Sequence, residues 1–250
     1  MNQFSRTELL IGAQGIERLQ NARVAVFGVG GVGGYTVEAL ARSGVGTLDL
    51  IDDDTVCLTN LNRQIIATHS TIGQYKVEVA RERILDINPK INVHIYKMFY
   101  MPETADFFDF SQYDYVVDAI DTVTGKIQLV MQADKTHTPI ISSMGAGNKM
   151  DPTAFKVADL YDTKVCPLAK VMRRELKKRG IQKLKVVYSE EIPTMLSPDL
   201  ALSEKMDGDV DTKKRIPGSI AFVPSVVGLI LAGEVIKDIL RTGRDSDYDI

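Results

Sequence analysis

The chain has 250 residues, which is long enough to bury a hydrophobic core without metal or disulfide cross-links. Its 30 basic and 33 acidic side chains give a formal net charge of −3, and its contents of hydrophobic (44%) and charged (25%) residues are ordinary for globular proteins, which excludes wholesale disorder and fibrous repeats. The two cysteines, Cys57 and Cys166, lie far apart without a CxxC pair; this excludes a disulfide framework and a four-cysteine zinc ribbon, and it favours a cytoplasmic location.

The first half of the chain alternates short apolar, β-branched segments with segments of helical periodicity. Strands and helices that alternate at this spacing predict βαβ units and a parallel sheet. The predicted strands are 23–27, 47–51, 91–96, 115–120 and 139–143, and the predicted helices are 31–43, 75–87, 103–109 and 124–136.

The second half predicts a continuation of this sheet. We therefore expect one α/β domain over residues 1–250, with a Rossmann-like parallel sheet, helices on both faces and further antiparallel strands in the second half. The additional strands are predicted near 154–159, near 184–188 and at 219–223, and the additional helices at 166–179 and 225–241.

Two segments of the second half need separate interpretation. Residues 189–212 hold seven acidic residues against one lysine and predict a mobile surface loop, for which a functional lid and a plain loop are equally open. Residues 216–233 are uncharged and approach the length of a membrane-spanning helix. Prolines and glycines divide this segment, so we predict a strand and then a helix with Pro224 as its first residue, without stable membrane insertion.

A glycine-rich turn follows the first predicted strand. Backbone N–H groups of such a turn can approach a phosphate, and the helix that follows adds a favourable dipole. The acidic residues 52–54 stand at the end of the second strand, where a ribose is held in dinucleotide-binding proteins. The turn fixes the ligand class as a nucleotide and leaves NAD and ATP open. Its glycines are Gly28, Gly30, Gly31 and Gly33.

Three residues beyond this turn distinguish ATP from NAD. A triphosphate needs cations from the loop and helix after the second strand, and Arg63 and Lys76 stand there. Asp121, at the end of the fourth strand, is well placed to hold magnesium at those phosphates. Taken singly, the two cations could be surface residues and the aspartate a helix N-cap.

Together these residues resemble the ubiquitin-activating-like adenylating superfamily. The shared motifs are GxGGxG, D-x-D-x-V-x-x-x-N-L-x-R-Q, G-Q-x-K and D-x-x-D, in this order over residues 24–121. The resemblance implies that a substrate carboxylate attacks the α-phosphorus of ATP to give an acyl-adenylate and pyrophosphate. It also assigns residues 1–150 to nucleotide binding and residues 151–250 to the substrate.

The resemblance further implies individual roles. Gly31 would hold phosphate and Asp52 ribose, Asp121 would bind Mg²⁺, and Arg6 would reach the partner's ATP across a homodimer. Thr122 departs from the asparagine that the carrier-activating members usually have. The implied catalytic residues are Arg6, Arg63, Lys76 and Asp121, and the implied ATP-binding residues are Gly28, Gly30, Gly31, Gly33, Asp52, Asp54, Asn60, Arg63 and Lys76.

A basic segment in the second half bears on the substrate. Residues 164–185 hold nine lysines and arginines against one glutamate, and the helical pattern gives them one apolar face. A local positive face on an acidic protein indicates a polyanion such as RNA, although a solvated helix face would give the same composition. Cys166 precedes this helix, where a dipole can lower a thiol pKa, but packing is the simpler interpretation.

The basic segment narrows the resemblance. Three segments of the chain are similar to the family of tRNA threonylcarbamoyladenosine dehydratases. They are RTELLIG near the start, SSMGAGNKMDPT at 142–153 and PLAKVMRRELKKRGI at 167–181. This implies that ATP activates the threonyl carboxylate of the modified adenosine, which then cyclises with net loss of water. The implied partners are tRNA, a second copy of the chain and a sulfur-relay protein. The implied tRNA-binding residues are Lys170, Arg173, Arg174, Lys177, Lys178 and Arg179.

Two alternatives remain open at this point. An enzyme that adenylates the C-terminus of a sulfur-carrier protein would share the motifs, although its zinc-bearing members need two CxxC pairs that this chain lacks. A nucleotide-binding scaffold or NAD-dependent sensor would share the glycine turn alone.

Overall fold

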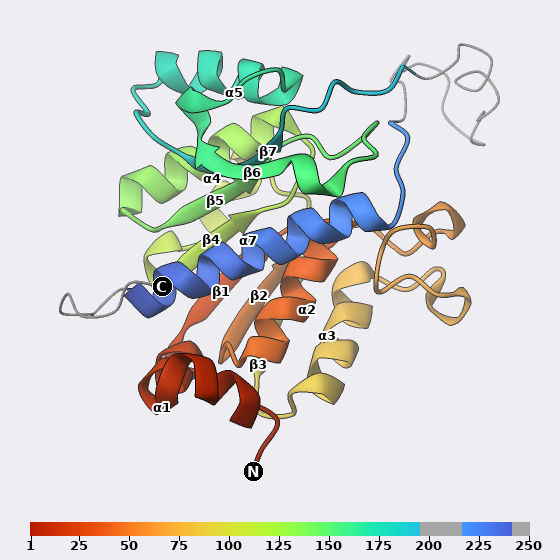
Figure 1. The fold of residues 1–250 in the computed structure, drawn as a ribbon, viewed down its shortest axis with the longest axis vertical. Helices are drawn as coiled ribbons and strands as arrows, with labels where there is room; N and C mark the ends of the chain where they lie inside the picture. The colour runs from red at the N-terminus through yellow and green to blue at the C-terminus, as the bar shows by residue number, and fades with distance from the viewer. Residues whose placement is uncertain (196–216, 242–250) are drawn as a thin grey trace.

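A seven-stranded sheet forms the centre of the computed structural model, which describes residues 1–195 and 217–241 (Figure 1). The strand order is β3-β2-β1-β4-β5-β7-β6, and every pair is parallel except β6 with β7. This confirms the predicted α/β fold class. The strands are β1 (Arg23–Phe27), β2 (Thr47–Ile51), β3 (Asn92–Tyr96), β4 (Tyr115–Asp118), β5 (Ile140–Ser143), β6 (Phe155–Asp159) and β7 (Lys185–Ser189).

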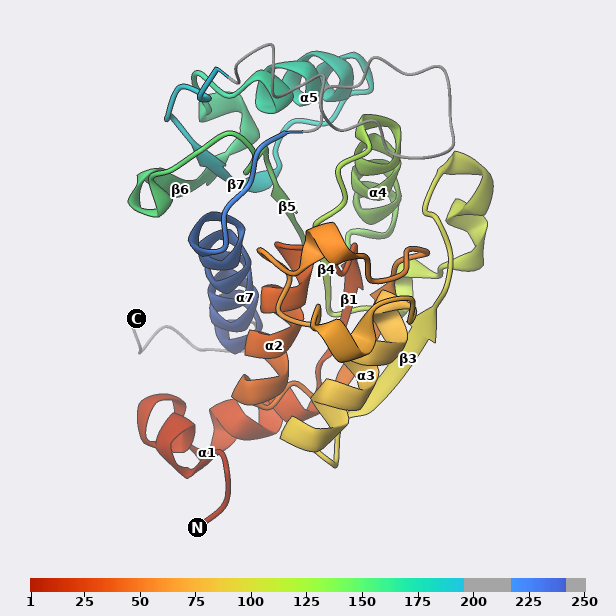
Figure 2. The same cartoon turned by 90° about the vertical axis from the view of Figure 1, so that its right-hand side faces the viewer.

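Helices cover both faces of the sheet (Figure 2). Alternate residues of a strand point to opposite faces, so in β1 Val24 and Val26 enter one core while Ala25 and Phe27 enter another. The first core packs against α1 (Ser5–Asn21), α2 (Gly33–Ser43), α3 (Lys76–Ile87) and α7 (Phe222–Arg241). The opposite face is covered by α4 (Val123–Thr136), α5 (Pro167–Lys178) and the 3-10 segment η3 (Pro102–Phe107).

The predicted strand at 219–223 is wrong, because α7 begins at Phe222 and residues 217–220 have no regular structure. The backbone at 218–219 bonds to side chains instead of a strand: the Gly218 N–H donates to Asn148 Oδ1 at 2.6 Å, and the Asn62 amide donates to the Ser219 carbonyl at 3.0 Å. Pro224 is the third residue of α7, where its missing N–H costs no helical hydrogen bond.

Other predictions differ in smaller ways. β7 continues the parallel sheet and only β6 reverses direction, while the helix predicted at 103–109 is the 3-10 segment η3. The loop predicted at 189–212 lies outside the described residues from 196 onward. Among the helices that the structure describes, none combines the length and the apolar character needed to cross a membrane.

Candidate active site

The glycine turn joins β1 to α2 and lies against the turn that follows β4. Gly28 has a φ of +89°, and a Cβ on this residue would lie 2.8 Å from the Ala119 carbonyl oxygen. A Cβ on Gly33 would lie 1.8 Å from the Gly28 carbonyl oxygen. The two turns therefore touch at the carboxyl ends of adjacent strands, which is where open α/β sheets bind their ligands.

Asp52 is joined to this turn by a hydrogen bond and to its own loop by another. Its Oδ2 accepts from the Val29 N–H at 2.7 Å, and its Oδ1 accepts from the Asp54 N–H at 2.9 Å. Burial raises the pKa of Asp52, and the Lys76 ammonium opposes this rise. Lys76 is itself buried, with Nζ 2.5 Å from Asp54 Oδ2 and 3.8 Å from Asp52 Oδ1. The structure thus brings these three predicted residues together beside the glycine turn.

Asn60 and Arg63 lie on the loop after β2. Asn60 is buried, and its Oδ1 accepts from the Cys57 N–H at 3.1 Å, which fixes the loop. A Cβ on Gly31 would lie 3.4 Å from Arg63 Cγ, so this arginine adjoins the glycine turn. Its Nη1 donates to the Thr59 carbonyl at 2.8 Å, and its guanidinium is therefore tied to its own loop in this structure.

Gln64 is a site residue that the sequence prediction did not single out, although the motif contains it. Its side chain is buried, and Oε1 has no hydrogen-bond partner within the described residues. A Cβ on Gly30 would lie 3.8 Å from Gln64 Nε2. A buried amide oxygen without a donor beside a phosphate-type turn fits a nucleotide that brings a hydroxyl or amino group.

Asp121 lies on the turn after β4, with an exposed side chain. Its Oδ1 accepts from the Thr122 hydroxyl at 3.3 Å, and no ion pair engages it within the described part of the chain. An available carboxylate at the carboxyl end of a central strand fits a hard divalent cation.

Lys126 is a second residue that the sequence pattern did not reveal. Its side chain and that of Asp118 are fully buried, and Lys126 Nζ donates to Asp118 Oδ1 at 2.9 Å and to the Ile120 carbonyl at 3.0 Å. The Ser142 hydroxyl donates to the other oxygen of Asp118 at 2.5 Å. This network fixes the turn immediately before Asp121 to α4 and to β5.

Arg6 lies away from the glycine turn of its own chain. It is exposed at the beginning of α1, two residues from Phe4, which packs against Gly44 at the carboxyl end of α2. The glycine turn is at the other end of α2, whose 11 residues span about 16 Å. Within one chain the structure therefore does not bring Arg6 to the other predicted residues.

The predicted RNA-binding residues fall into three groups. Glu175 pairs with Arg174, Lys178 and Arg179 at 3.0–3.1 Å, and hydrogen bonds from these cations lower its pKa to about 2. Arg173 instead donates to Thr163 and is half-buried. Lys170 and Lys177 form the third group: their side chains are exposed and have no polar partner among the described residues.

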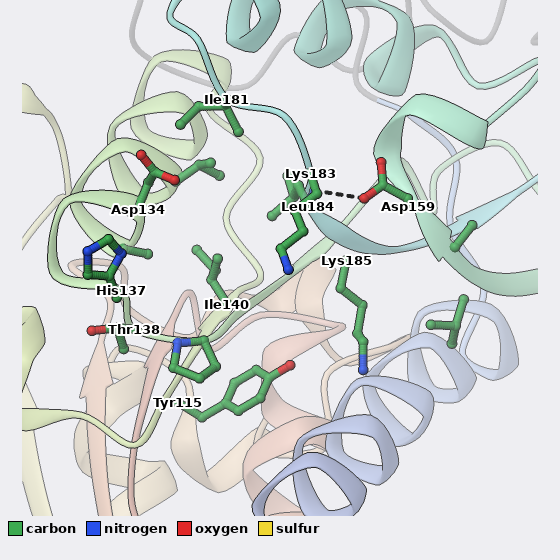
Figure 3. A pocket seen from close by; sticks show the side chains of 15 residues that line it. Tyr115, Asp134, His137, Thr138, Ile140, Asp159, Ile181, Lys183, Leu184 and Lys185 are labelled. Carbon is green, nitrogen blue, oxygen red and sulfur yellow. Dashed lines mark hydrogen bonds between the residues drawn. The ribbon is translucent and has the colours of Figure 1, made fainter. Parts of the chain in front are cut away.

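A cavity of about 650 Å³ lies at the other end of the sheet, where β4, β5 and β7 begin (Figure 3). Two residues that line the cavity contact Asp238 on α7. Lys185 Nζ lies 2.7 Å from Asp238 Oδ2, and the Tyr115 hydroxyl donates to the same oxygen at 2.8 Å. These contacts tie the sheet to α7. The cavity shares no lining residue with the glycine turn and therefore lies apart from the predicted nucleotide site.

Comparisons with known proteins agree with this geometry. The model of the ThiF family matches residues 4–248. A tRNA threonylcarbamoyladenosine dehydratase of Bacillus subtilis is 50% identical over 244 residues, which cover 96% of each chain. The solved structure of the Escherichia coli tRNA N6-threonylcarbamoyladenosine dehydratase in complex with ATP is 32% identical, with a TM-score of 0.84 and coverage of 96% of this chain and 94% of that one. Its complex with AMP gives the same TM-score at 33% identity. The chain therefore belongs to the ThiF family, in its branch of tRNA threonylcarbamoyladenosine dehydratases.

Proposed function

We propose that this chain uses ATP to adenylate the carboxylate of threonylcarbamoyladenosine in tRNA and then promotes cyclisation of the nucleoside, with release of AMP and pyrophosphate. The observation that carries the proposal is 50% identity to a dehydratase over 96% of both chains. The glycine turn supports a nucleotide site consistent with that activity, because Asp52 bonds to it and the Gln64 oxygen beside it has no hydrogen-bond partner among the described residues.

The positions of the side chains support the ATP-site roles that we propose. The glycine turn would hold phosphate, and Asp52 would hold the ribose. Arg63 and Lys76 would match the charge of the triphosphate, for which each must exchange its present partner for a phosphate oxygen. Asn60 keeps the loop that carries Arg63 in place.

We infer Asp121 as the Mg²⁺ ligand, because its carboxylate is exposed and not ion-paired within the described residues. When bound there, Mg²⁺ would neutralise phosphate charge as pyrophosphate departs. Lys126 and Asp118 would keep the turn that carries Asp121 in position for this role.

The chemistry needs no side-chain nucleophile. A carboxylate oxygen of the substrate attacks the α-phosphorus, and the bond from this phosphorus to the oxygen bridging the β-phosphate breaks. An atom of the carbamoyl group then attacks the activated carbonyl carbon, AMP leaves with the bonding electrons, and a proton passes to solvent. The side chains contribute by positioning the reactants and stabilising the charge that develops.

The larger assembly is part of the proposal. A homodimer would let Arg6 reach the partner's ATP, since Arg6 lies at the far end of α2 from its own glycine turn. Residues 1–150 would bind the nucleotide, and residues 151–250 would face the RNA. We also propose a cytoplasmic location, where ATP and tRNA are found, and a sulfur-relay protein as a further partner.

The experiment is nucleoside analysis of tRNA that carries threonylcarbamoyladenosine, after incubation with ATP, Mg²⁺ and the protein. We expect AMP and pyrophosphate to form together with a nucleoside lighter by one water, and unmodified tRNA to give none of these. Equal AMP formation with both tRNAs would overturn the proposal. Activation of a sulfur carrier is not favoured, because the chain matches the dehydratases over nearly its full length and lacks CxxC pairs.

A further inference from the structure

A groove of about 560 Å³ follows the exposed side of α4. Five polar residues of this helix line it, and four of them are spaced so that they form one stripe on the helix surface. The groove starts three residues after Asp121 and runs along the helix for about 16 Å. The stripe consists of Thr124, Gln128, Gln132 and Lys135.

The two ends of the groove have different surroundings. Thr124 lies in the first turn of α4, next to the turn that carries Asp121. At the other end Lys135 and Arg179 both line the groove, and Arg179 follows the last turn of the basic helix α5. Asp134 lines this end as well, and Arg179 is ion-paired with Glu175, so Lys135 is the lining cation without an ion pair among the described residues. The groove thus connects the nucleotide site to the basic surface.

The lining has the chemistry of a single-stranded RNA site. Ile127, Met131 and Pro102 supply apolar surface on which a base can rest. The amides of Gln128 and Gln132 offer both donors and acceptors, which suit base edges and ribose hydroxyls. Cations at the far end suit phosphates, and phosphate contacts fix the register of a bound strand.

We propose that the groove along α4 holds the tRNA strand that flanks the modified adenosine. This inference rests on the proposed function, because the modified base must place its carboxylate at the α-phosphate while the rest of the loop leaves the site. The groove starts where that strand would emerge and ends at the basic surface. The RNA-facing surface therefore extends from α5 into the nucleotide-binding half of the chain.

The test changes the charge of the groove without changing its shape. We expect Gln128→Glu and Gln132→Glu each to weaken binding of threonylcarbamoylated tRNA roughly fivefold, and to raise KM for this tRNA by the same factor, because each adds a negative charge beside the strand. The KM for ATP and the Tm should stay at the wild-type values. The matched control is Asn92→Asp, which adds the same charge at the exposed start of β3, on the edge strand farthest from β6.

A change of the opposite sign excludes damage to the fold as the cause. Gln128→Lys should tighten tRNA binding, and the salt dependence of its Kd should steepen. If the glutamate and lysine variants both bind tRNA as Asn92→Asp does, the groove assignment is wrong. Direct binding is measured without turnover, so this result is independent of AMP formation; wild-type protein that binds the tRNA but forms no AMP would contradict the proposed function alone.

Discussion

At the residue scale, the buried pair of Lys126 and Asp118 sets the position of the turn that carries Asp121. Both side chains are fully removed from solvent, and the lysine also bonds to the Ile120 carbonyl. A buried ion pair costs desolvation, and replacing both partners with apolar residues is often neutral. We interpret this pair as a positioning device, since its contacts end one residue before a proposed ligand.

Lys126→Met should lower the free energy of unfolding by about 3–5 kcal/mol, because it leaves Asp118 buried without a cation. The double variant Lys126→Met with Asp118→Leu should recover most of that loss. Urea denaturation measures both values. Equal stability of the single variant and the wild type would show that the pair has no structural role.

Glu175 pairs with three cations of α5 and its C-cap and so reduces the positive charge that this helix can offer to RNA. Glu175→Gln should strengthen tRNA binding severalfold, because it releases Arg174, Lys178 and Arg179 for phosphates. The pKa of Glu175 is lowered to about 2. Glu175 therefore stays ionised and paired at higher pH, and it loses its charge only as the pH falls towards that value. Acidification of the wild-type protein from pH 8 to pH 5 should therefore not produce the gain in tRNA affinity that we expect for Glu175→Gln.

Filter binding at two salt concentrations tests this prediction, since exposed pairs weaken as salt rises and the difference between the proteins should shrink. A matched removal of charge at Glu190, which pairs with Lys156 on β6, serves as control. Weaker binding by Glu175→Gln than by wild type would mean that the glutamate orders the cations for RNA instead of withholding them.

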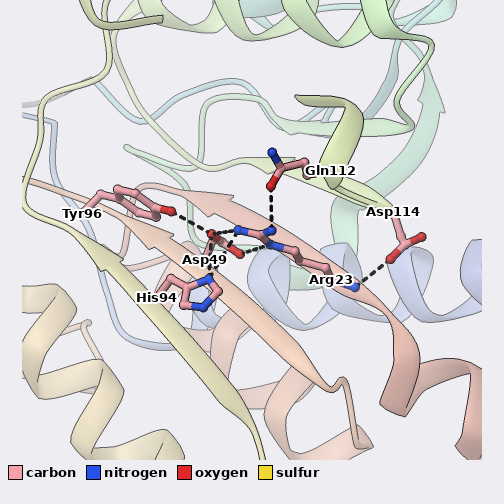
Figure 4. Close-up of polar contacts among 6 residues, drawn as sticks. All are labelled: Arg23, Asp49, His94, Tyr96, Gln112 and Asp114. Atoms are coloured by element: carbon pink, nitrogen blue, oxygen red, sulfur yellow. Dashed lines mark hydrogen bonds and ion pairs between the residues drawn. The ribbon is translucent and has the colours of Figure 1, made fainter. Parts of the chain in front are cut away.

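At the element scale, one buried carboxylate ties the first three strands together (Figure 4). Asp49 on β2 accepts from Arg23 on β1 at 2.8 Å through both oxygens. On β3, the Tyr96 hydroxyl donates to it at 3.1 Å, and His94 Nδ1 lies 3.3 Å away. The pKa of Arg23 is raised, chiefly by its hydrogen bonds to Asp49. These bonds oppose sliding of the strands on this face.

Removal of Arg23 and removal of Asp49 should lower the free energy of unfolding by different amounts. Arg23→Met should cost about 3 kcal/mol of unfolding free energy, because the carboxylate stays buried and loses its cation. Asp49→Asn should cost about 1–2 kcal/mol, because Arg23 is 26% exposed and can reach water while an amide keeps hydrogen bonds. Thermal denaturation ranks the variants, and the reverse order would contradict the network as described.

Periodicity predicted the strands of the first half closely because each strand is short, apolar and bounded by turn residues. It failed at 219–223, where an uncharged segment is compatible with strand and helix, and tertiary contacts with Asn148 and Asn62 decide the outcome. It did not predict α1, because the pattern is interrupted at Gly12, where φ is +71°. The motif residues around the glycine turn were predicted; Lys126 was not, since a helical lysine has no pattern that reveals its burial.

At the scale of the whole molecule, the position of Arg6 leads to a prediction about how two chains share an active site. Mixing equal amounts of Arg6→Ala and Lys76→Ala chains should restore about a quarter of wild-type activity, because half of the dimers would be mixed and each would hold one intact site. Each variant alone should be inactive. AMP formation after subunit exchange is the measurement, and sustained inactivity of the mixture would mean that Arg6 does not act across a dimer.

The contact between Gly28 and the Ala119 carbonyl has a consequence for evolution and engineering. Because a Cβ on Gly28 would lie 2.8 Å from this oxygen, any side chain at position 28 must displace the turn that follows β4. We therefore expect a substitution at Gly28 to shift the proposed phosphate site and the proposed cation site at Asp121 together, so that neither can be redesigned alone.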